Sequence, residues 1–106
     1  MINYEQFSQT ELQVAEVKTA ERVTGSDKLL KLMISLGEEE RQIIAGIGKA
    51  YEPESLIGKQ IIIVANLEPR QLMGLESQGM LLAADSEAGP VLLMPDKPVS
   101  PGSKIK

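Results

Sequence analysis

The sequence predicts an all-β domain in which five short strands close into a small barrel. Three observations predict it. Apolar and polar residues alternate over Leu30–Leu36, as in a half-buried strand. The run Ile61–Ala65 is apolar and largely β-branched, which suits a strand buried on both faces. Residues 11–23 read as one long bulged strand. The length of 106 residues suits one domain, with its core at about residues 10–85 and an extension over about residues 86–106.

The first elements are a short helix and a long, bent strand. Residues 3–9 are expected to be helical, because Asn3 can cap them and Gln6 follows three residues later, as in a capping box. The long strand then covers about Glu11–Val23. Its apolar residues occupy even-numbered positions first, Leu12 and Val14, and then odd-numbered ones, Ala15 and Val17. Such a slip implies a β-bulge, and bulged strands help small barrels to close.

Turn residues separate the remaining elements. Thr24–Asp27 and Gly37–Glu39 carry typical turn chemistry, and Pro53–Leu56 begins a helical turn that a glycine ends. We expect the second to fifth strands at Leu30–Leu36, Arg41–Ile47, Ile61–Ala65 and Gly79–Ala84, with a loop at Leu67–Gln78 and a proline-broken tail beyond Asp85.

Five strands with a short helix after the third is the element order of an OB-fold barrel. An SH3-like barrel has the same number of strands and is the alternative, although it usually has no helix at that point. The fold alone would not give the function.

The composition excludes most catalytic machinery. There is no Cys, His or Trp, so a thiolate nucleophile, a Ser-His-Asp relay and a zinc site with nitrogen and sulfur ligands are ruled out. The longest acidic run, Glu38–Glu40, is expected at a hairpin tip, where adjacent carboxylates point to opposite faces and do not converge on a metal. We therefore expect no enzyme activity of the chain by itself, no metal and no cofactor.

Charge and aromatic content bear on possible partners. With 15 acidic and 11 basic residues the net charge is −4, which disfavours non-specific nucleic-acid binding unless the bases gather on one face. The three aromatic residues, Tyr4, Phe7 and Tyr51, are too few for extensive base stacking. The longest apolar run is far shorter than the roughly 20 residues that span a bilayer, and the polar N-terminus is not a signal peptide. A cytoplasmic domain without a membrane partner is expected.

Two segments nevertheless suit a nucleic acid. Lys31 alternates with leucines and so projects outward, with Lys28 just before it. Asn66–Met80 offers an amide, a proline-held Arg70 and the adaptable Met73, in the loop that forms one wall of the usual OB-fold cleft. Spacing alone favours simpler interpretations, a solvated strand face and a loop whose methionine plugs the barrel end.

The tail carries one apolar patch, Val91, Leu92, Leu93 and Met94. Such a patch either closes the barrel or meets a partner, and a second copy of the chain is the commonest partner. These four residues are therefore the predicted dimer interface.

Four ordered motifs resemble the tRNA-binding domain appended to methionyl-tRNA synthetases. They are Ser26–Leu29, Gln42–Ile47, Pro53–Lys59 and, above all, Asn66–Met80, which reads NLxPRxLMGxESxGM. The resemblance runs from about Tyr4 to the C-terminus. It is strongest to the C-terminal domain, or separate β subunit, of the bacterial and archaeal enzymes.

The resemblance implies an OB barrel that forms a homodimer through its C-terminal extension and binds the outer corner of tRNA largely without regard to sequence. The implied partners are tRNA, a second copy and the catalytic region of methionyl-tRNA synthetase. Glu68 stands where many relatives carry Lys, and Gln71 where many carry Lys or Arg, so weak and salt-sensitive binding is expected. Matching positions imply tRNA contacts by Lys28, Lys31, Arg41, Asn66, Arg70, Met73 and Ser77.

A dimeric protein-export chaperone of the same barrel family, which binds unfolded polypeptide in an apolar groove, is the alternative function. The Asn66–Met80 motif follows the tRNA-binding branch more closely. Methionine activation by this chain is not expected, because the GxxxxGK[ST], HIGH and KMSKS signatures are all absent.

Overall fold

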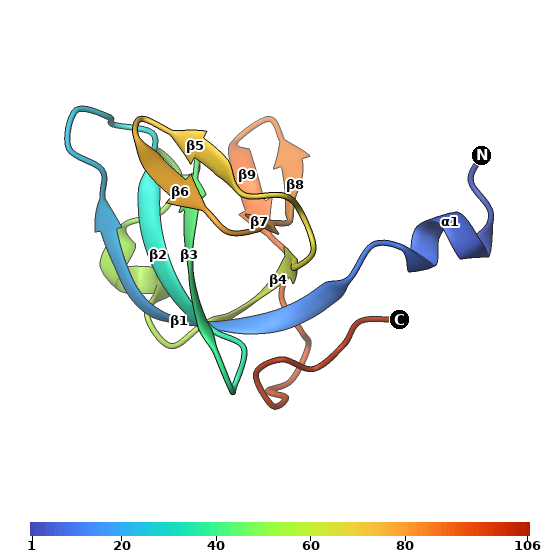
Figure 1. The fold of residues 1–106 in the computed structure, drawn as a ribbon. Helices are drawn as coiled ribbons and strands as arrows, with labels where there is room; N and C mark the ends of the chain where they lie inside the picture. Colours follow the sequence, from blue (N-terminus) through green and yellow to red (C-terminus); the bar gives the residue numbers. More distant parts are fainter.

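A computed structural model describes residues 1–106 and shows a curled antiparallel sheet in the strand order β3-β2-β1-β4-β7 (Figure 1). Two small two-stranded sheets accompany it, β5-β6 and β8-β9. The elements are α1 (Tyr4–Ser8), β1 (Leu12–Arg22), β2 (Leu30–Ser35), β3 (Glu40–Ala45), the 3-10 turn η1 (Pro53–Leu56), β4 (Gln60–Val64), β5 (Arg70–Leu72), β6 (Leu75–Ser77), β7 (Met80–Leu81), β8 (Ala83–Ser86) and β9 (Gly89–Leu92).

The long strand β1 is shared between two neighbours. Its first half, Leu12–Glu16, pairs with β4, and its second half, from Glu16 onward, pairs with β2. The register shifts between Val17 and Thr19, so the strand contains a bulge, as predicted, but not at the parity change between Val14 and Ala15, where the pairing with β4 is regular. Val14 is buried on the other face because the C-terminal tail lies along it. The bend at the bulge lets one strand serve both sides of the barrel.

The core fills the inside of the curled sheet, as the alternation in β2 and the apolar run in β4 predict. Leu30, Leu32 and Ile34 point inward from β2 and are almost fully buried. The turn η1 adds Leu56 to the same core. In β4, Ile61 and Ile63 join the core while Ile62 and Val64 are buried on the other face, so the strand is covered on both faces.

Three expectations differ from the structure. The expected loop over Leu67–Gln78 contains the β5–β6 hairpin. The expected fifth strand, Gly79–Ala84, is broken at Leu82 into β7 and β8, and β8 then pairs with β9 in the expected tail. Each difference arises because strands of two to four residues are too short to show an apolar alternation.

The two ends of the chain leave the barrel side by side (Figure 1). The N-terminal helix has the predicted capping box between Asn3 and Gln6. The C-terminal tail lies along the first half of β1, where Gly102 and Ile105 donate backbone hydrogen bonds to the carbonyls of Val14 and Leu12. Gly102 has φ +90°, and a Cβ there would lie 2.2 Å from the Leu36 carbonyl oxygen, so this close approach requires glycine.

Candidate nucleic-acid interface

Four of the seven predicted contact residues have accessible side chains and lie on neighbouring segments. Lys28 belongs to the 23–29 loop, Lys31 to β2, and Arg70 and Met73 to the β5–β6 hairpin. The loop and the hairpin tip lie at the same end of the barrel (Figure 1). We call Lys28, Lys31, Arg70 and Met73 the four-residue surface.

The 23–29 loop is held rigidly by short polar contacts. The Ser26 hydroxyl accepts hydrogen bonds from the amides of Lys28 at 3.2 Å and Leu29 at 3.1 Å. The amide of Gly48 donates to the Lys28 carbonyl at 2.7 Å. A Cβ at Gly48 would lie 2.8 Å from that oxygen, so only glycine lets the two loops approach this closely.

The hairpin tip turns on Met73 and Gly74, with φ of +49° and +79°. Two consecutive residues with positive φ make the two-residue turn that suits a right-twisted hairpin, a turn in which Asn-Gly is favoured. Met73 adopts the left-handed conformation at some cost, and its side chain is 59% exposed. Residues in sparsely populated backbone conformations cluster at functional sites, which makes Met73 a candidate contact residue.

A groove of about 320 Å³ separates the hairpin tip from β1 and β2. Its walls include Val23, Lys31, Met73 and Leu75. The Met73 methyl lies close to the 23–29 loop, 3.6 Å from where a Cβ at Gly25 would stand. The groove thus brings a lysine from β2 and the hairpin methionine to one place, as the family resemblance implies.

A second groove, of about 350 Å³, lies on the other side of the loop and holds Lys28 and Lys49. Lys49 and its neighbour Arg22, which donates to the Gly48 carbonyl at 2.8 Å, were missed in the sequence. In the sequence, the only hint of these two residues is the pair Gly46 and Gly48, because glycines are common where two backbone segments pack closely together.

Ion pairs neutralise much of this region. Lys31 pairs with Glu21 at 2.8 Å, Arg22 with Glu52 at 3.3 Å and Lys49 with Asp27 at 3.8 Å. Lys28 and Arg70 have no ion-pair partner. The cations and carboxylates of these segments are equal in number, so the region has no net charge. The five cations are Arg22, Lys28, Lys31, Lys49 and Arg70. The five carboxylates are Glu21, Asp27, Glu52, Glu68 and Glu76. Exposed ion pairs stabilise a fold by about 0–1 kcal/mol, so an RNA phosphate can replace a carboxylate as the partner.

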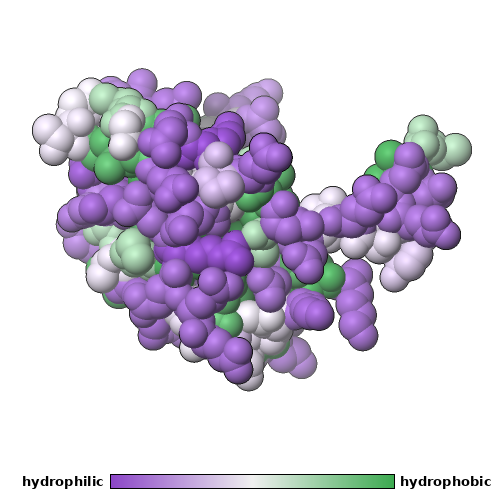
Figure 2. Space-filling view, in the orientation of Figure 1, coloured by the Kyte–Doolittle hydropathy of each residue, from purple (hydrophilic) through white to green (hydrophobic).

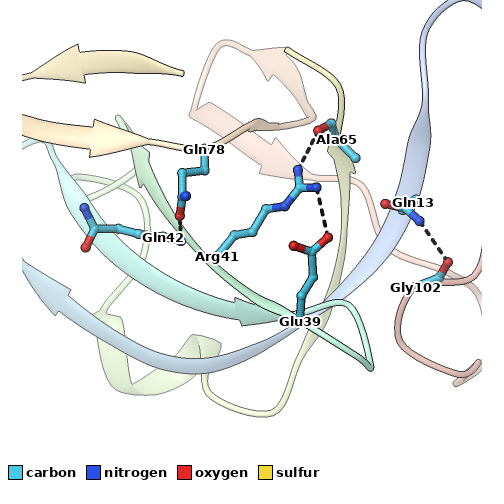
Figure 3. A network of polar contacts seen from close by, with 7 residues as sticks. All are labelled: Gln13, Glu39, Arg41, Gln42, Ala65, Gln78 and Gly102. Carbon is cyan, nitrogen blue, oxygen red and sulfur yellow. Dashed lines mark hydrogen bonds and ion pairs between the residues drawn. The ribbon is translucent and has the colours of Figure 1, made fainter. Parts of the chain in front are cut away.

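Two other predicted contacts, Arg41 and Asn66, have structural roles. Arg41 is largely buried and donates to the Ala65 carbonyl and to the Glu39 carboxylate (Figure 3). The Asn66 side chain accepts from the Glu11 amide at 2.9 Å and donates to the Gln9 carbonyl at 2.7 Å. Both side chains hold the place where the N-terminal segment joins the barrel.

The buried Ser77 and Leu92 are also corrections. Ser77 is 1% exposed, and its hydroxyl accepts from the Ile44 amide and donates to the Gly79 carbonyl, both at 3.0 Å. Ser77 therefore has no free face for a ligand. Leu92 packs in the core, so of the predicted dimer patch Val91–Met94 only Val91, Leu93 and Met94 are exposed.

A further apolar surface lies on the N-terminal segment, which we call the arm (residues 1–10). Every residue of the arm is exposed, including Met1, Ile2, Tyr4 and Phe7. Figure 2 shows the arm standing away from a mostly hydrophilic barrel face, with hydrophobic atoms at its outer end. A groove of about 300 Å³ runs between the arm and the C-terminal tail, where Ile105 forms part of its wall.

Features of other kinds of site are few. No group of three His, Cys, Asp or Glu side chains gathers as metal ligands would, and no helix is long and apolar enough to cross a membrane. The Glu16 carboxylate accepts a hydrogen bond from Lys18 at 2.9 Å and raises the pKa of Lys18 above its usual value.

Comparisons with known proteins agree with the resemblance seen in the sequence. A family model described as "Putative tRNA binding domain" matches residues 12–104. The chain is 61% identical over 104 residues to a methionine–tRNA ligase of Caldanaerobacter subterraneus, a match that covers 98% of the chain and 16% of that enzyme. The chain thus spans about one-sixth of the length of the curated relative.

Two solved structures have nearly the same backbone. A MetRS related protein from Pyrococcus horikoshii is 37% identical with a TM-score of 0.94, and the match covers 100% of this chain and 98% of that one. The chaperone CsaA from Bacillus anthracis is 34% identical with a TM-score of 0.92, covering 100% and 99% of the two chains. These neighbours confirm the OB barrel.

Proposed function

The chain belongs to the tRNA-binding domain family and is homologous to part of methionine–tRNA ligase, and from this premise we propose that its four-residue surface grips folded tRNA. It binds RNA largely without regard to sequence and aids aminoacylation in the cytoplasm, as the C-terminal domain or a separate subunit of methionyl-tRNA synthetase. The catalytic region of that enzyme supplies the chemistry.

The observation that carries this proposal is the groove that brings Lys31 of β2 together with Met73 of the hairpin tip. The loop that carries Lys28 lies beside the same tip, and Arg70 belongs to the same hairpin. Helical RNA is recognised by its shape, through phosphates and 2′-hydroxyls, because its major groove is too narrow for side chains. A few rigidly held cations and one apolar side chain suit such a contour. The balanced charge of the region means that position, not bulk charge, supplies the specificity for folded RNA.

The test is to measure tRNA binding over a range of salt concentrations. Three phosphate contacts, one for each cation of the four-residue surface, give a slope of log K against log salt near −2 to −3, so a threefold rise in salt lowers affinity by roughly one order of magnitude. Unstructured RNA of the same length competes poorly if contour is recognised. Absence of tRNA binding at low salt contradicts the proposal.

Met73→Asn separates turn strain from RNA contact. Asn tolerates positive φ and is favoured at this turn position, so the hairpin remains at least as stable. The apolar side chain is lost, and we expect tRNA affinity to fall about three- to tenfold, or ~1 kcal/mol. Thermal unfolding and filter binding measure the two effects, and equal affinity would show that Met73 does not touch RNA.

We also propose a homodimer that joins the arm of one copy to the arm and tail of the other. The arm has four exposed apolar side chains beside a groove of mixed polar and apolar lining, and an exposed apolar surface of this kind indicates a contact with a partner. The exposed Val91, Leu93 and Met94 form a second candidate contact. Two copies would present two four-residue surfaces to one tRNA and so raise the effective concentration of each.

The variant Phe7→Asp tests this dimer. A charge in a buried contact is costly, and Phe7 lies outside the core, so we expect the chain to sediment as a folded monomer. Its unfolding temperature would no longer rise with protein concentration, as that of a dimer does. Met94→Asp is the matched variant on the second patch. If only Met94→Asp dissociates the dimer, the contact is the patch formed by Val91, Leu93 and Met94 and not the arm.

The likeness to CsaA supports a second candidate function, binding of unfolded polypeptide. That protein is called a chaperone, and the exposed apolar arm is the surface that would take a peptide here. Competition distinguishes the two: an unfolded client that displaces tRNA shares its surface, whereas a client that binds only while the arm is intact uses another one.

A further inference from the structure

We propose that Gln42 and Gln78 form a latch that positions the β5–β6 hairpin, and with it Arg70 and Met73, for RNA. Both glutamines are half-buried, whereas Arg70 and Met73 are exposed. This inference rests on the proposed function and assigns positioning residues to the same site.

The hairpin is poorly fixed by its own strands. β5 and β6 make three residue pairs with each other and form a sheet separate from the barrel. An isolated two-stranded hairpin is marginally stable in water. The position of Arg70 and Met73 therefore depends on what ties the hairpin to the barrel.

The tie is a set of hydrogen bonds to the outer edge of β3. The Gln78 side-chain oxygen accepts from the Gln42 amide at 3.0 Å, and the Gln42 side-chain nitrogen donates to the Glu76 carbonyl at 2.8 Å (Figure 3 shows the first). The Gln78 amide donates to the Gln42 carbonyl at 2.8 Å. The backbone and side chain of each glutamine thus bind the segment that carries the other.

β3 needs these partners because it is the last strand on its side of the sheet. Amides of an edge strand that point outward are left without a strand partner, and buried amides are almost always bonded. The amides of Gln42 and Ile44 are satisfied by the side chains of Gln78 and Ser77. The same side chains that complete the edge of the barrel therefore locate the hairpin.

The experiment uses methionine, which keeps the shape of glutamine and lacks its hydrogen bonds. Gln42→Met and Gln78→Met are each expected to lower tRNA affinity about fivefold, comparable to the net contribution of one hydrogen bond. Neither variant removes a charge. Both are nevertheless expected to make the slope of log K against log salt less negative, because the displaced hairpin no longer holds Arg70 at an RNA phosphate. Faster amide exchange at Gln42 is expected in Gln78→Met.

Gln60→Met is the matched control. Gln60 makes two side-chain hydrogen bonds to backbone, to the nitrogen and oxygen of Val99 in the C-terminal extension, one more than either latch glutamine, so its loss is at least as severe a test of general stability. The variant is expected to leave tRNA affinity and its salt dependence unchanged, which separates positioning from a general loss of stability.

A double-mutant cycle completes the test. If Gln42 acts through Arg70, the losses from Gln42→Met and Arg70→Ala do not add, whereas the losses from Gln42→Met and Lys28→Ala do. Wild-type affinity and salt slope in Gln42→Met, with Arg70→Ala still harmful, would overturn the latch alone. A chain that does not bind tRNA at all would overturn the proposed function and the latch with it.

Discussion

Replacing Arg70 by alanine lowers tRNA affinity about tenfold at low salt. It also makes the slope of log K against log salt less negative by about the amount that one phosphate contact contributes. The side chain is exposed and free of any ion pair, so its guanidinium meets RNA without first leaving a carboxylate. A hydrogen bond to a charged group contributes about 1.5–3 kcal/mol, and each neutralised phosphate adds about 0.7–0.9 to the slope. Filter binding of one tRNA at several salt concentrations measures both.

Three variants show whether position or charge is responsible. Lys97→Ala removes a cation outside the four-residue surface, beside Met94, and is expected to change neither quantity. Arg70→Lys keeps the charge but loses the planar fork, so it retains the slope and only part of the affinity. Glu68→Lys adds a cation to the same segment and tightens binding. Equal losses from Lys97→Ala and Arg70→Ala would contradict the assignment.

The sequence predicted those parts of the fold that depend on apolar pattern. The alternation from Leu30 to Leu36 predicted a half-buried strand, whereas the parity change between Val14 and Ala15 marks a strand covered on both faces and not the bulge itself, which lies after Val17. Asn3 and Gln6 predicted the capped helix through purely local chemistry. Each of these signals lies within a few residues, where backbone geometry and side-chain burial are tightly linked.

The site was less predictable because it depends on distant polar contacts. Lys28, Lys31, Arg70 and Met73 were placed by family resemblance, and of these the structure brings Lys31 and Met73 into one groove. Resemblance cannot distinguish a residue that touches a ligand from one that holds another residue in place. Polar side chains such as Ser77 satisfy backbone groups far away in sequence, and no periodicity records such a partner.

The glycine that seats the 23–29 loop is expected to matter for both stability and binding. In Gly48→Ala the new methyl group would lie 2.8 Å from the Lys28 oxygen and 3.1 Å from an Arg22 nitrogen. Both belong to groups already bonded to Gly48, so the loops must separate. Overpacking of this kind costs about 1–3 kcal/mol, which lowers the unfolding temperature by roughly 5–15 °C. Since Lys28 moves with the loop, tRNA affinity falls as well.

Gly46→Ala is the matched control, two residues earlier in the same loop. Its nearest neighbour would be Cε of the Lys28 side chain at 3.0 Å, the far end of a flexible chain that can rotate away. The unfolding temperature is therefore expected to stay within a few degrees of the wild type, with tRNA affinity nearly unchanged. Comparing the two variants separates the effect of moving the 23–29 loop backbone from the effect of moving only the Lys28 side chain, because only Gly48→Ala moves the backbone. Equal unfolding temperatures for the two variants would show that the close approach of the loops does not hold the RNA-facing end of the barrel together.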